Sequence, residues 1–457
     1  ERDATRKMWY LSAMTIETIT WLPGNWVSKL YFMIDKCFTL RPTALSVLRK
    51  LKTIFDEYQS KKGMGLTVSQ QNKKSLYLLL IGVFFIFLNF NIAQTITPIY
   101  ILDIGGTEFH SGLQSTLFYL TAVLLRFYFG PLADRHGNRI TLFIGGMAFM
   151  TAPLLFLFNQ SLVYVLLVRM YQAIGLGAFF SSASSLVSAL APKEKLGAYI
   201  GFYRLITMFS LLVGPSLAIK VIHGSTYFWY HVLGFAAGLL GMIFLHFVQE
   251  PARTEQESTG RISHDYQMLD LLKKKKLLPI YQALLLVAIF YGLLQTFSGI
   301  FVVQAFENVN PGLFFTMFGL GSIAANLTAG YLSDFKGRAQ VAFPCIIAMG
   351  IGTAVLALLP FSKIILFFGS IIAGFGFAGA ISVLIAWVVD EAPAARRTSA
   401  LALQDNSIDI GIAAGSFLFG ILIPLIGLSW TYAISGIALI VLIYSLGNSI
   451  RKKHIYD

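Results

Sequence analysis

Long, continuous runs of apolar residues follow one another along the chain from Ser75 to Asn448. A bilayer core about 30 Å thick is crossed by roughly 20 apolar residues in a helix. The runs do not alternate between apolar and polar positions, so they predict helices and not the strands of a barrel. The twelve predicted spans lie at about residues 75–101, 109–133, 140–158, 161–189, 197–221, 227–248, 278–304, 311–333, 340–360, 364–388, 398–424 and 428–449.

A polar stretch from Glu250 to Lys276 separates the first six spans from the last six. The pattern therefore predicts an all-α membrane protein made of two six-helix bundles. The expected segments are an N-terminal cytoplasmic extension (1–71), a first bundle (72–248), a cytoplasmic linker (249–277), a second bundle (278–450) and a cytoplasmic tail (451–457). Composition agrees, because 56% of the residues are hydrophobic and only 12% are charged, against about 25% charged in soluble domains.

Lysine and arginine collect in the connections on one side of the predicted membrane. They are Lys73, Lys74, Arg135, Arg139, Lys193, Lys195, Lys273 to Lys276, Lys336, Arg338, Arg396, Arg397 and Arg451 to Lys453, whereas the other side has Lys363 and little else. Because basic loops stay in the cytoplasm, we expect a multi-pass protein of the inner (plasma) membrane with both termini cytoplasmic. The net charge of +13 then reflects orientation and anionic lipid headgroups, not nucleic acid.

The first 62 residues leave two interpretations open. A basic amphipathic stretch from Leu40 to Lys62 is typical of a helix lying on the inner leaflet. Alternatively, this segment lies upstream of the true start, since Met64, a polar linker and Lys73 form an ordinary beginning for a membrane core.

A short motif occurs twice, each time between the second and third spans of a half. The first copy runs from Gly130 through Asp134, Arg135 and Gly137 to Arg139. The second copy contains Gly330, Asp334, Gly337 and Arg338. Its recurrence as G-x-L-x-D-x-x-G indicates an internal repeat.

The motif has a readable physical role. We expect its first glycine to allow close approach of helix backbones and its second glycine to permit a tight turn. The aspartate is placed to meet an arginine or a helix N-terminus. We interpret the two loops as latches that close the cytoplasmic side in one conformation.

On this motif the chain resembles the major facilitator superfamily, over about residues 72–450, in its bacterial drug and sugar efflux branch. The fourth span carries Arg169 and Gln172 in a pattern similar to the family's R-x-x-Q-G-x-G-A, with Ala173 in place of the first glycine. The resemblance implies a role for Arg169 in proton coupling or substrate contact. Gly214-Pro215 in span five resembles an incomplete antiporter element and predicts a helix bend.

Further charges inside the spans mark a predicted cavity, namely Arg126, Arg204, Asp405 and Asp409. Charged groups are costly in the bilayer, by at least about 2.5 to 3.5 kcal/mol each, so we expect them to face water or a partner. Asp405 and Asp409 share one helix face at spacing i, i+4. Asp409 is the candidate for protonation and Asp405 the candidate gate partner of an arginine in the other half; a static polar contact is the alternative.

Uncharged polar residues complete the predicted cavity: Asn91, Gln94 and Gln295. The first span has no acidic residue to attract cations, which favours neutral polar or anionic solutes such as sugars or organic acids, with lipophilic drugs still possible. No metal site, catalytic residue or cofactor is expected, because the histidines are scattered and the two cysteines lie far apart. A pump is disfavoured because the sequence lacks a phosphate-binding G-x-x-x-x-G-K-[ST] loop.

The sequence thus predicts a transporter and not an enzyme. We expect a monomer that moves a small solute by rocking of its two bundles, with proton-coupled efflux as the favoured mode. Uptake or facilitated exchange of a metabolite is the alternative, and a nontransporting membrane sensor is a third hypothesis.

Overall fold

The computed structural model describes residues 68–192, 196–223, 227–251, 271, 274, 277–393 and 396–456. Residues Gln71–Asp457 form one compact unit, and the description below concerns that unit. The predicted helix at Leu40 to Lys62, most of the linker and Lys193, Lys195, Lys273, Lys275 and Lys276 lie outside the described residues.

Within the described residues, twelve helices are long and apolar enough to cross a membrane, which confirms the predicted number of spans. The first six are α4 (Val68–Asp103), α5 (Glu108–His136), α6 (Asn138–Leu155), α7 (Leu162–Leu190), α8 (Leu196–His223) and α9 (Tyr227–His246). The last six are α12 (Leu278–Ala305), α13 (Gly312–Lys336), α14 (Arg338–Leu356), α15 (Lys363–Glu391), α16 (Arg397–Ile426) and α17 (Leu428–Tyr456).

Glycine and proline decide where several helices end. The turns after α5 and α13 are made by Gly137 and Gly337, whose φ angles of 100° and 93° confirm the tight turn predicted for the motif. The third helix of each half is shorter than predicted, since α6 ends at Leu155 and α14 at Leu356. After α14, Pro360 lies in a 3₁₀ turn (η3, Leu359–Phe361), because proline fits a first helical turn but not a helix interior.

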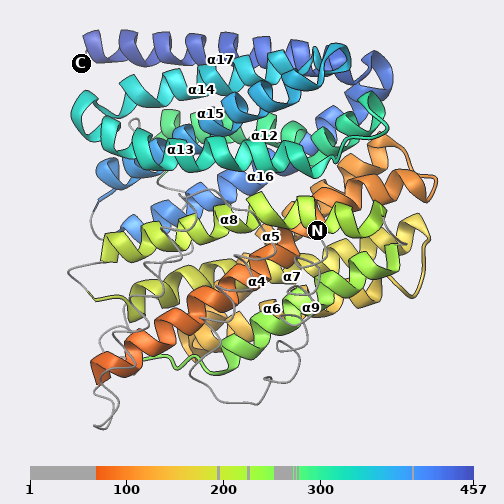
Figure 1. Cartoon of the computed structure of the whole chain (residues 1–457). Coiled ribbons are helices and arrows are strands. Elements are labelled where there is room, and N and C mark those ends of the chain that lie inside the picture. The colour runs from red at the N-terminus through yellow and green to blue at the C-terminus, as the bar shows by residue number, and fades with distance from the viewer. Residues whose placement is uncertain are drawn as a thin grey trace, which may run out of the picture. The chain divides into compact units, whose positions relative to one another are not determined.

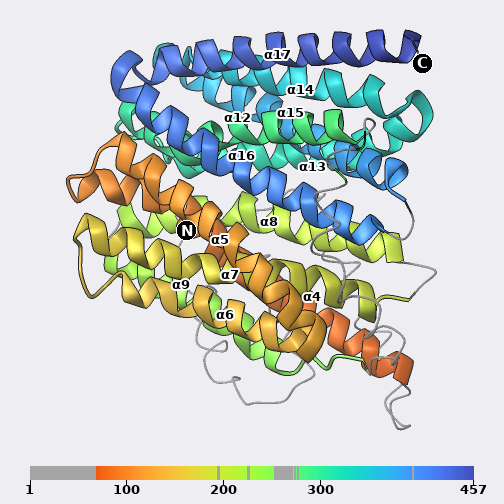
Figure 2. The ribbon, with the colours of Figure 1, turned by 180° about the vertical axis from the view of Figure 1, so that it is seen from behind.

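The helices form two halves, α4–α9 and α12–α17, which lie side by side in Figures 1 and 2. The halves meet mainly through two helix pairs, α5 with α16 and α8 with α13. Within the second half, α15 packs on both α13 and α14; within the first, α7 packs on α5 and α6. The repeated motif is therefore matched by equivalent packing in both halves.

Large apolar side chains point both inward and outward, as a bilayer requires. Leu79, Phe149 and Tyr432 are fully buried in the cores. Leu124, Val163 and Ile437 are more than half exposed, since a lipid-facing surface needs no polar side chains.

Backbones come closest where a glycine faces a neighbouring helix. A Cβ atom on Gly374 of α15 would clash with the backbone carbonyl of Phe318 in α13. A Cβ atom on Gly201 of α8 would meet nothing within 4 Å. Close packing of α13 on α15 therefore depends on the missing side chain at Gly374.

We expect Gly374→Ala to lower the thermal stability of the detergent-solubilised protein, because overpacking typically costs about 1–3 kcal/mol. Gly201→Ala is the matched control and should leave stability unchanged or slightly improved, since alanine favours helix. Melting followed by size-exclusion chromatography checks both variants. Equal melting temperatures for the two would contradict the packing argument.

Candidate functional site

A buried ion pair joins the two halves. Arg126 in the middle of α5 places Nη2 2.5 Å from Oδ2 of Asp409 in α16. Its Nη1 also donates a hydrogen bond of 3.1 Å to Oδ1 of Asn406, one turn earlier in α16. Asp409 is 6% exposed, so its charge depends on Arg126 for compensation. Asn406 was missed by the sequence analysis, although it precedes Asp409 at spacing i, i+3.

Asp405 was predicted to be the gate partner of an arginine in the other half, but the ion pair observed between the halves does not involve it. Its side chain is exposed and accepts a 3.0 Å hydrogen bond from Nε2 of Gln404 in the same helix. It lies within electrostatic reach of Arg126 and of the half-buried Arg204 in α8. The observed inter-half ion pair is nevertheless formed by Asp409, because the extra turn of α16 brings Asp409 to the contact with α5.

Arg169 in α7 is completely buried and is held by three glutamines. Its Nε donates to Oε1 of Gln114 at 2.6 Å, and its Nη2 donates to Oε1 of Gln94 at 2.5 Å. Its Nη1 donates to Oε1 of Gln172. The guanidinium carbon also lies 4.3 Å from the ring centre of Phe118. The predicted pair of Arg169 and Gln172 is therefore in contact.

Neutral amides can accept hydrogen bonds from Arg169, but they do not cancel its charge. Gln114 and Phe118 of α5 were not predicted as members of this group. Their signal in the sequence is Gln114, a long polar side chain inside a predicted span, followed by the aromatic Phe118 one helical turn later. The planar guanidinium fixes three acceptors at once, which makes Arg169 a rigid centre of the first half.

Tyr119 in α5 connects this group to the second half. Its hydroxyl accepts a 3.1 Å hydrogen bond from Nε2 of Gln94. The side-chain amide of Gln295 in α12 lies beside the same hydroxyl, with Oε1 at 3.0 Å and Nε2 at 2.7 Å. Gln94 and Gln295, both predicted as cavity residues, are thus brought together by a tyrosine that was not. Asn91 instead contacts its own half, where Nδ2 donates to Oγ of Ser210 at 2.9 Å.

The described polar contacts between the halves continue from this level toward the end of the bundle that lies opposite the basic loops. Thr296 in α12 donates to Ser115 in α5 at 3.1 Å and lies 3.0 Å from the hydroxyl of Ser416 in α16. On the other helix pair, the hydroxyls of Ser216 in α8 and Thr316 in α13 lie 2.7 Å apart. At this end the two halves are closed against each other.

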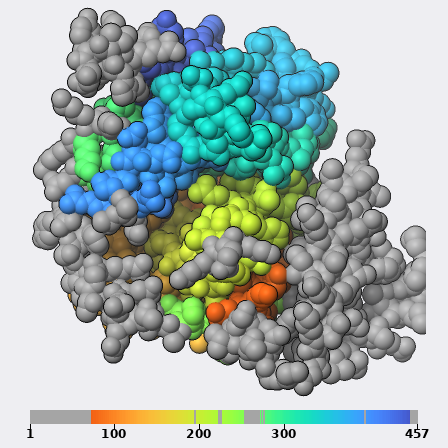
Figure 3. All heavy atoms as spheres, turned by 90° about the vertical axis from the view of Figure 1, so that its left-hand side faces the viewer, coloured from red at the N-terminus to blue at the C-terminus, as the bar shows by residue number. Residues whose placement is uncertain are grey.

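At the other end, which carries the basic loops, the described residues of the two halves leave a hollow between them (Figure 3). A Cβ atom on Gly130 or Gly330 would meet nothing within 4 Å, so the predicted close backbone approach at these glycines is wrong for this conformation. Figure 3 views this end and shows deeper, shaded atoms between the blue atoms of α16 and the yellow-green atoms of α8.

Two stacked aromatic pairs occupy matching places in the two halves. Phe87 in α4 stacks on Phe180 in α7 with ring centres 4.2 Å apart and an angle of 16°. Tyr291 in α12 stacks on Phe377 in α15 at 3.8 Å and 12°. Each pair joins the first and fourth helices of its half, and all four side chains are half-buried. The sequence analysis did not single them out, because aromatic residues are frequent throughout the spans.

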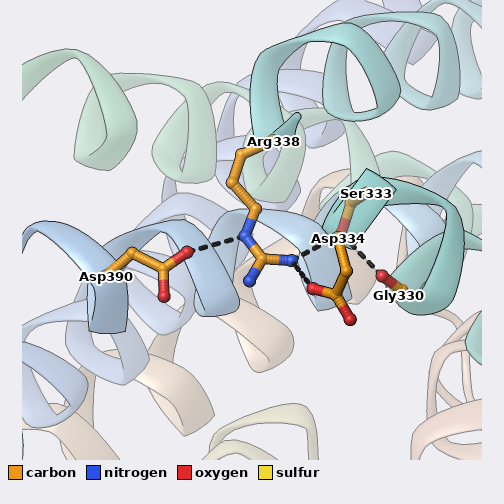
Figure 4. Close-up of polar contacts among 5 residues, drawn as sticks. All are labelled: Gly330, Ser333, Asp334, Arg338 and Asp390. Atoms are coloured by element: carbon orange, nitrogen blue, oxygen red, sulfur yellow. Dashed lines mark hydrogen bonds and ion pairs between the residues drawn. The ribbon is translucent and has the colours of Figure 1, made fainter. Parts of the chain in front are cut away.

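The loop of the second half is tied together by Arg338 (Figure 4). This arginine contacts Asp334 of its own motif at 2.5 Å and Asp390 at the end of α15 at 2.7 Å. It also donates to Ser333, whose hydroxyl donates to the carbonyl of Gly330. The contact predicted between the motif's aspartate and an arginine is present, and it stays within one half.

The loop of the first half uses a different carboxylate. Glu250, just after α9, accepts hydrogen bonds from the backbone N–H groups of Asn138 and Arg139, at 3.1 Å and 3.0 Å. A carboxylate at the N-terminus of α6 is favoured by the helix dipole. Arg139 also donates to the carbonyl of His246. Arg135 is exposed and Asp134 is half-buried.

The predicted bend residues lie within one continuous helix, because α8 runs through Pro215 from Leu196 to His223. A Cβ atom on Gly214 would lie 3.1 Å from Leu88 of α4. The glycine therefore serves close packing between α8 and α4.

With the fold and these contacts established, the chain can be compared with known proteins. The family model described as Major Facilitator Superfamily matches residues 79–309 and 284–449. The chain belongs to this superfamily. It is thus a member of a transporter family with many membrane-spanning helices, as the sequence motifs indicated.

Similar proteins in bacteria include multidrug transporters. The chain is 22% identical to the quinolone resistance protein NorA of Staphylococcus aureus over 176 residues, which cover 38% of this chain and 45% of NorA. It is 24% identical to a multi-drug resistance efflux pump PmrA homolog of Lactococcus lactis over 295 residues, covering 60% and 68%. The match to NorA thus spans less than half of that protein's length.

Solved structures show the same fold at low sequence identity. The nucleoside transporter NupG superimposes with a TM-score of 0.68 at 14% identity, covering 81% of this chain and 98% of NupG. A peptide transporter POT in complex with sulfate gives 0.68 at 15%, covering 83% and 94%.

We expect Arg169→Lys to lower both melting temperature and transport strongly, because an ammonium group cannot reach three glutamine oxygens in the plane of a guanidinium. A loss of about 2–4 kcal/mol in stability is expected for leaving buried amides without their charged donor. Arg135→Lys, at an exposed position, is the control and should melt like the wild type. If the two variants behaved alike, the three-glutamine arrangement would not matter for stability.

Proposed function

We propose that the protein is a proton-coupled exporter that moves amphipathic aromatic solutes by alternating access. The observation that carries the proposal is the ion pair between the partly buried Arg126 and the buried Asp409, which connects the two halves. A carboxylate in this place can exchange its arginine partner for a proton, and the halves are then no longer held by charge.

An ion pair across the interface can couple the movement of a proton to the movement of a solute in the opposite direction. A proton on Asp409 removes its charge, and a bound solute that competes for Arg126 or Asp409 has the same effect on the pair. The empty, charged carrier keeps its halves tied. It therefore changes conformation when loaded with a proton or with a solute, and this is the condition for coupled antiport.

The direction of transport follows from the orientation of the loops. Under the positive-inside rule, the end with Arg135, Arg139 and Arg338 is cytoplasmic, and both termini of the core then lie in the cytoplasm. The hollow in Figure 3 would accept solute from the cytoplasm. Export is further supported by the likeness to the Lactococcus lactis efflux pump homolog. We expect a monomer in the inner (plasma) membrane that needs no cofactor besides the proton.

The substrate class follows from the stacked rings. Phe87 with Phe180 and Tyr291 with Phe377 present one aromatic pair from each half. A flat aromatic molecule placed between the halves gains offset stacking and apolar burial from either pair. Arg126, Arg204 and Asp405 supply charges of both signs nearby. This arrangement favours lipophilic aromatic solutes over the sugars that the uncharged first span alone suggested.

We expect Asp409→Asn to abolish solute transport driven by a pH gradient in proteoliposomes, with at least about a tenfold loss of rate, because asparagine cannot exchange a proton. Solute exchange without a gradient should persist. Glu307→Gln, which neutralises an exposed carboxylate in the α12–α13 connection, is the control and should keep wild-type coupling. Full gradient-driven transport by Asp409→Asn, with an unchanged pH profile, would refute the coupling role.

We expect Phe87→Leu and Tyr291→Leu each to raise KM for a planar aromatic solute about three- to tenfold while changing kcat little, since one stacking interaction is worth about 0.5–1.5 kcal/mol. Phe368→Leu removes a ring that is 62% exposed on α15 and serves as the control. Flux of a fluorescent aromatic dye is the measurement. A KM that is unchanged in both Phe87→Leu and Tyr291→Leu would argue for a nonaromatic substrate.

A further inference from the structure

The hydrogen bond between Gln94 and Tyr119 has a fixed direction. Arg169 can only donate, so its bond to Gln94 requires the amide oxygen of Gln94 to face the guanidinium. The amide nitrogen of Gln94 must then face Tyr119, whose hydroxyl accepts from it. The Tyr119 hydroxyl also meets the side-chain amide of Gln295, with Oε1 3.0 Å away as an acceptor and Nε2 2.7 Å away as a donor.

This chain of bonds crosses from one half to the other. Arg169, Gln94 and Tyr119 belong to the first half, and Gln295 belongs to α12 of the second. Gln94 and Gln295 come from the first helix of their respective halves, so one hydroxyl is shared between two matching helices. Tyr119 is 4% and Gln295 8% exposed, which means that water does not compete for the bond in this conformation.

Tyr119 also shares a helix face with the inter-half ion pair. It precedes Arg126 by seven residues, which is two turns of α5 or about 10.5 Å. Thr116, three residues before Tyr119, donates to the carbonyl of Ala413 in α16 at 3.0 Å. One stripe of α5 thus carries three hydrogen-bond or ion-pair contacts to the second half, and among these three the contact at Tyr119 continues to Arg169. A separate route to Arg169 runs from Thr296 of α12 through Ser115 and Gln114.

We propose that Tyr119 is a positioning residue that couples the arrangement of the buried Arg169 group to closure of the two halves at the end opposite the basic loops. Separation of the halves at that end removes Gln295 from the Tyr119 hydroxyl. That hydroxyl then has one fixed partner fewer, so it holds Gln94 less firmly, and Gln94 is one of the three acceptors that orient Arg169. By the reciprocity of linked equilibria, a change at Arg169 or Gln94 alters the closure in return.

This inference rests on the rocking motion proposed above, but not on the identity of the solute or on proton coupling. Tyr119 differs from an ordinary buried tyrosine because its hydroxyl contacts side chains of both halves. Tyr432 offers the comparison, because it is also buried and its hydroxyl lies 2.8 Å from that of Ser298, yet both residues belong to the second half.

The experiment measures distances between spin labels in purified protein without solute, at one pH. Cysteines replace Thr107 and Leu425 to report the end opposite the basic loops, and His136 and Lys336 to report the basic end. The two native cysteines are removed by Cys37→Ser and Cys345→Ala, so that only the introduced cysteines carry labels. Each reporter pair joins one residue of the first half to one of the second.

Tyr119→Phe should shift the equilibrium toward the conformation that is open at the Thr107–Leu425 end by about three- to tenfold, since it removes one inter-half hydrogen bond and keeps the ring. Gln295→Leu should give a similar shift, and the double variant should add little to either single one. Gln94→Leu should shift the equilibrium in the same direction, although it removes no bond between the halves. Tyr432→Phe should leave the distances unchanged.

The possible results distinguish the role of Tyr119 at the interface, its coupling to Arg169 and the proposed transport mechanism. Unchanged distances in Tyr119→Phe, or an equal shift in Tyr432→Phe, would overturn the role of Tyr119. A shift in Tyr119→Phe without one in Gln94→Leu would reduce the residue to a simple contact between the halves and overturn the coupling to Arg169. If Asp409→Asn changes the distances and Tyr119→Phe does not, the proposed transport mechanism survives and this inference fails. If no variant changes them, both fail.

Discussion

The constraint that organises this protein is the cost of placing charge inside a membrane-spanning bundle. Arg126 and Asp409 can be buried in α5 and α16 because each compensates the other across the interface between the halves. A pair of this kind is strong only while it is intact, and removal of either charge leaves the other exposed to a large desolvation penalty. This charged contact between the halves is therefore one that protonation or a competing charge can release.

Arg169 meets the same constraint in another way. It lies inside one half and takes its hydrogen bonds from three uncharged glutamines, so its positive charge is positioned without being neutralised. One of those glutamines also touches Tyr119, and Tyr119 touches Gln295 in the second half. The buried group around Arg169 and the interface between the halves are consequently parts of one polar network. The side chains that connect them, Gln94, Tyr119 and Gln295, are uncharged.

The two ends of the bundle differ in whether the observed polar contacts lie within a half or between the halves. Among the described residues, Glu250 holds the motif loop of the first half and Arg338 with Asp390 holds that of the second, and each of these contacts lies within one half. At the opposite end the short hydroxyl contacts, such as Ser216 with Thr316, run between the halves. The described residues of the two bundles are thus in contact at one end and leave a hollow at the other (Figure 3), and each half carries one stacked aromatic pair between its first and fourth helices.

The sequence by itself determined the number of helices, their approximate bounds, the two halves and the loop motif, because apolar length and glycine turns are local properties of the chain. It also marked Arg126, Arg169, Gln94, Gln295 and Asp409, since polar side chains within apolar spans are conspicuous. The tertiary structure decided the partners: Asp409 in place of Asp405 for Arg126, and Tyr119 as the link between the two glutamines. It also decided that Gly130 and Gly330 stand open. Partners depend on the rotation and depth of each helix against the others, which arise from packing between segments far apart in the chain and leave no local pattern to read.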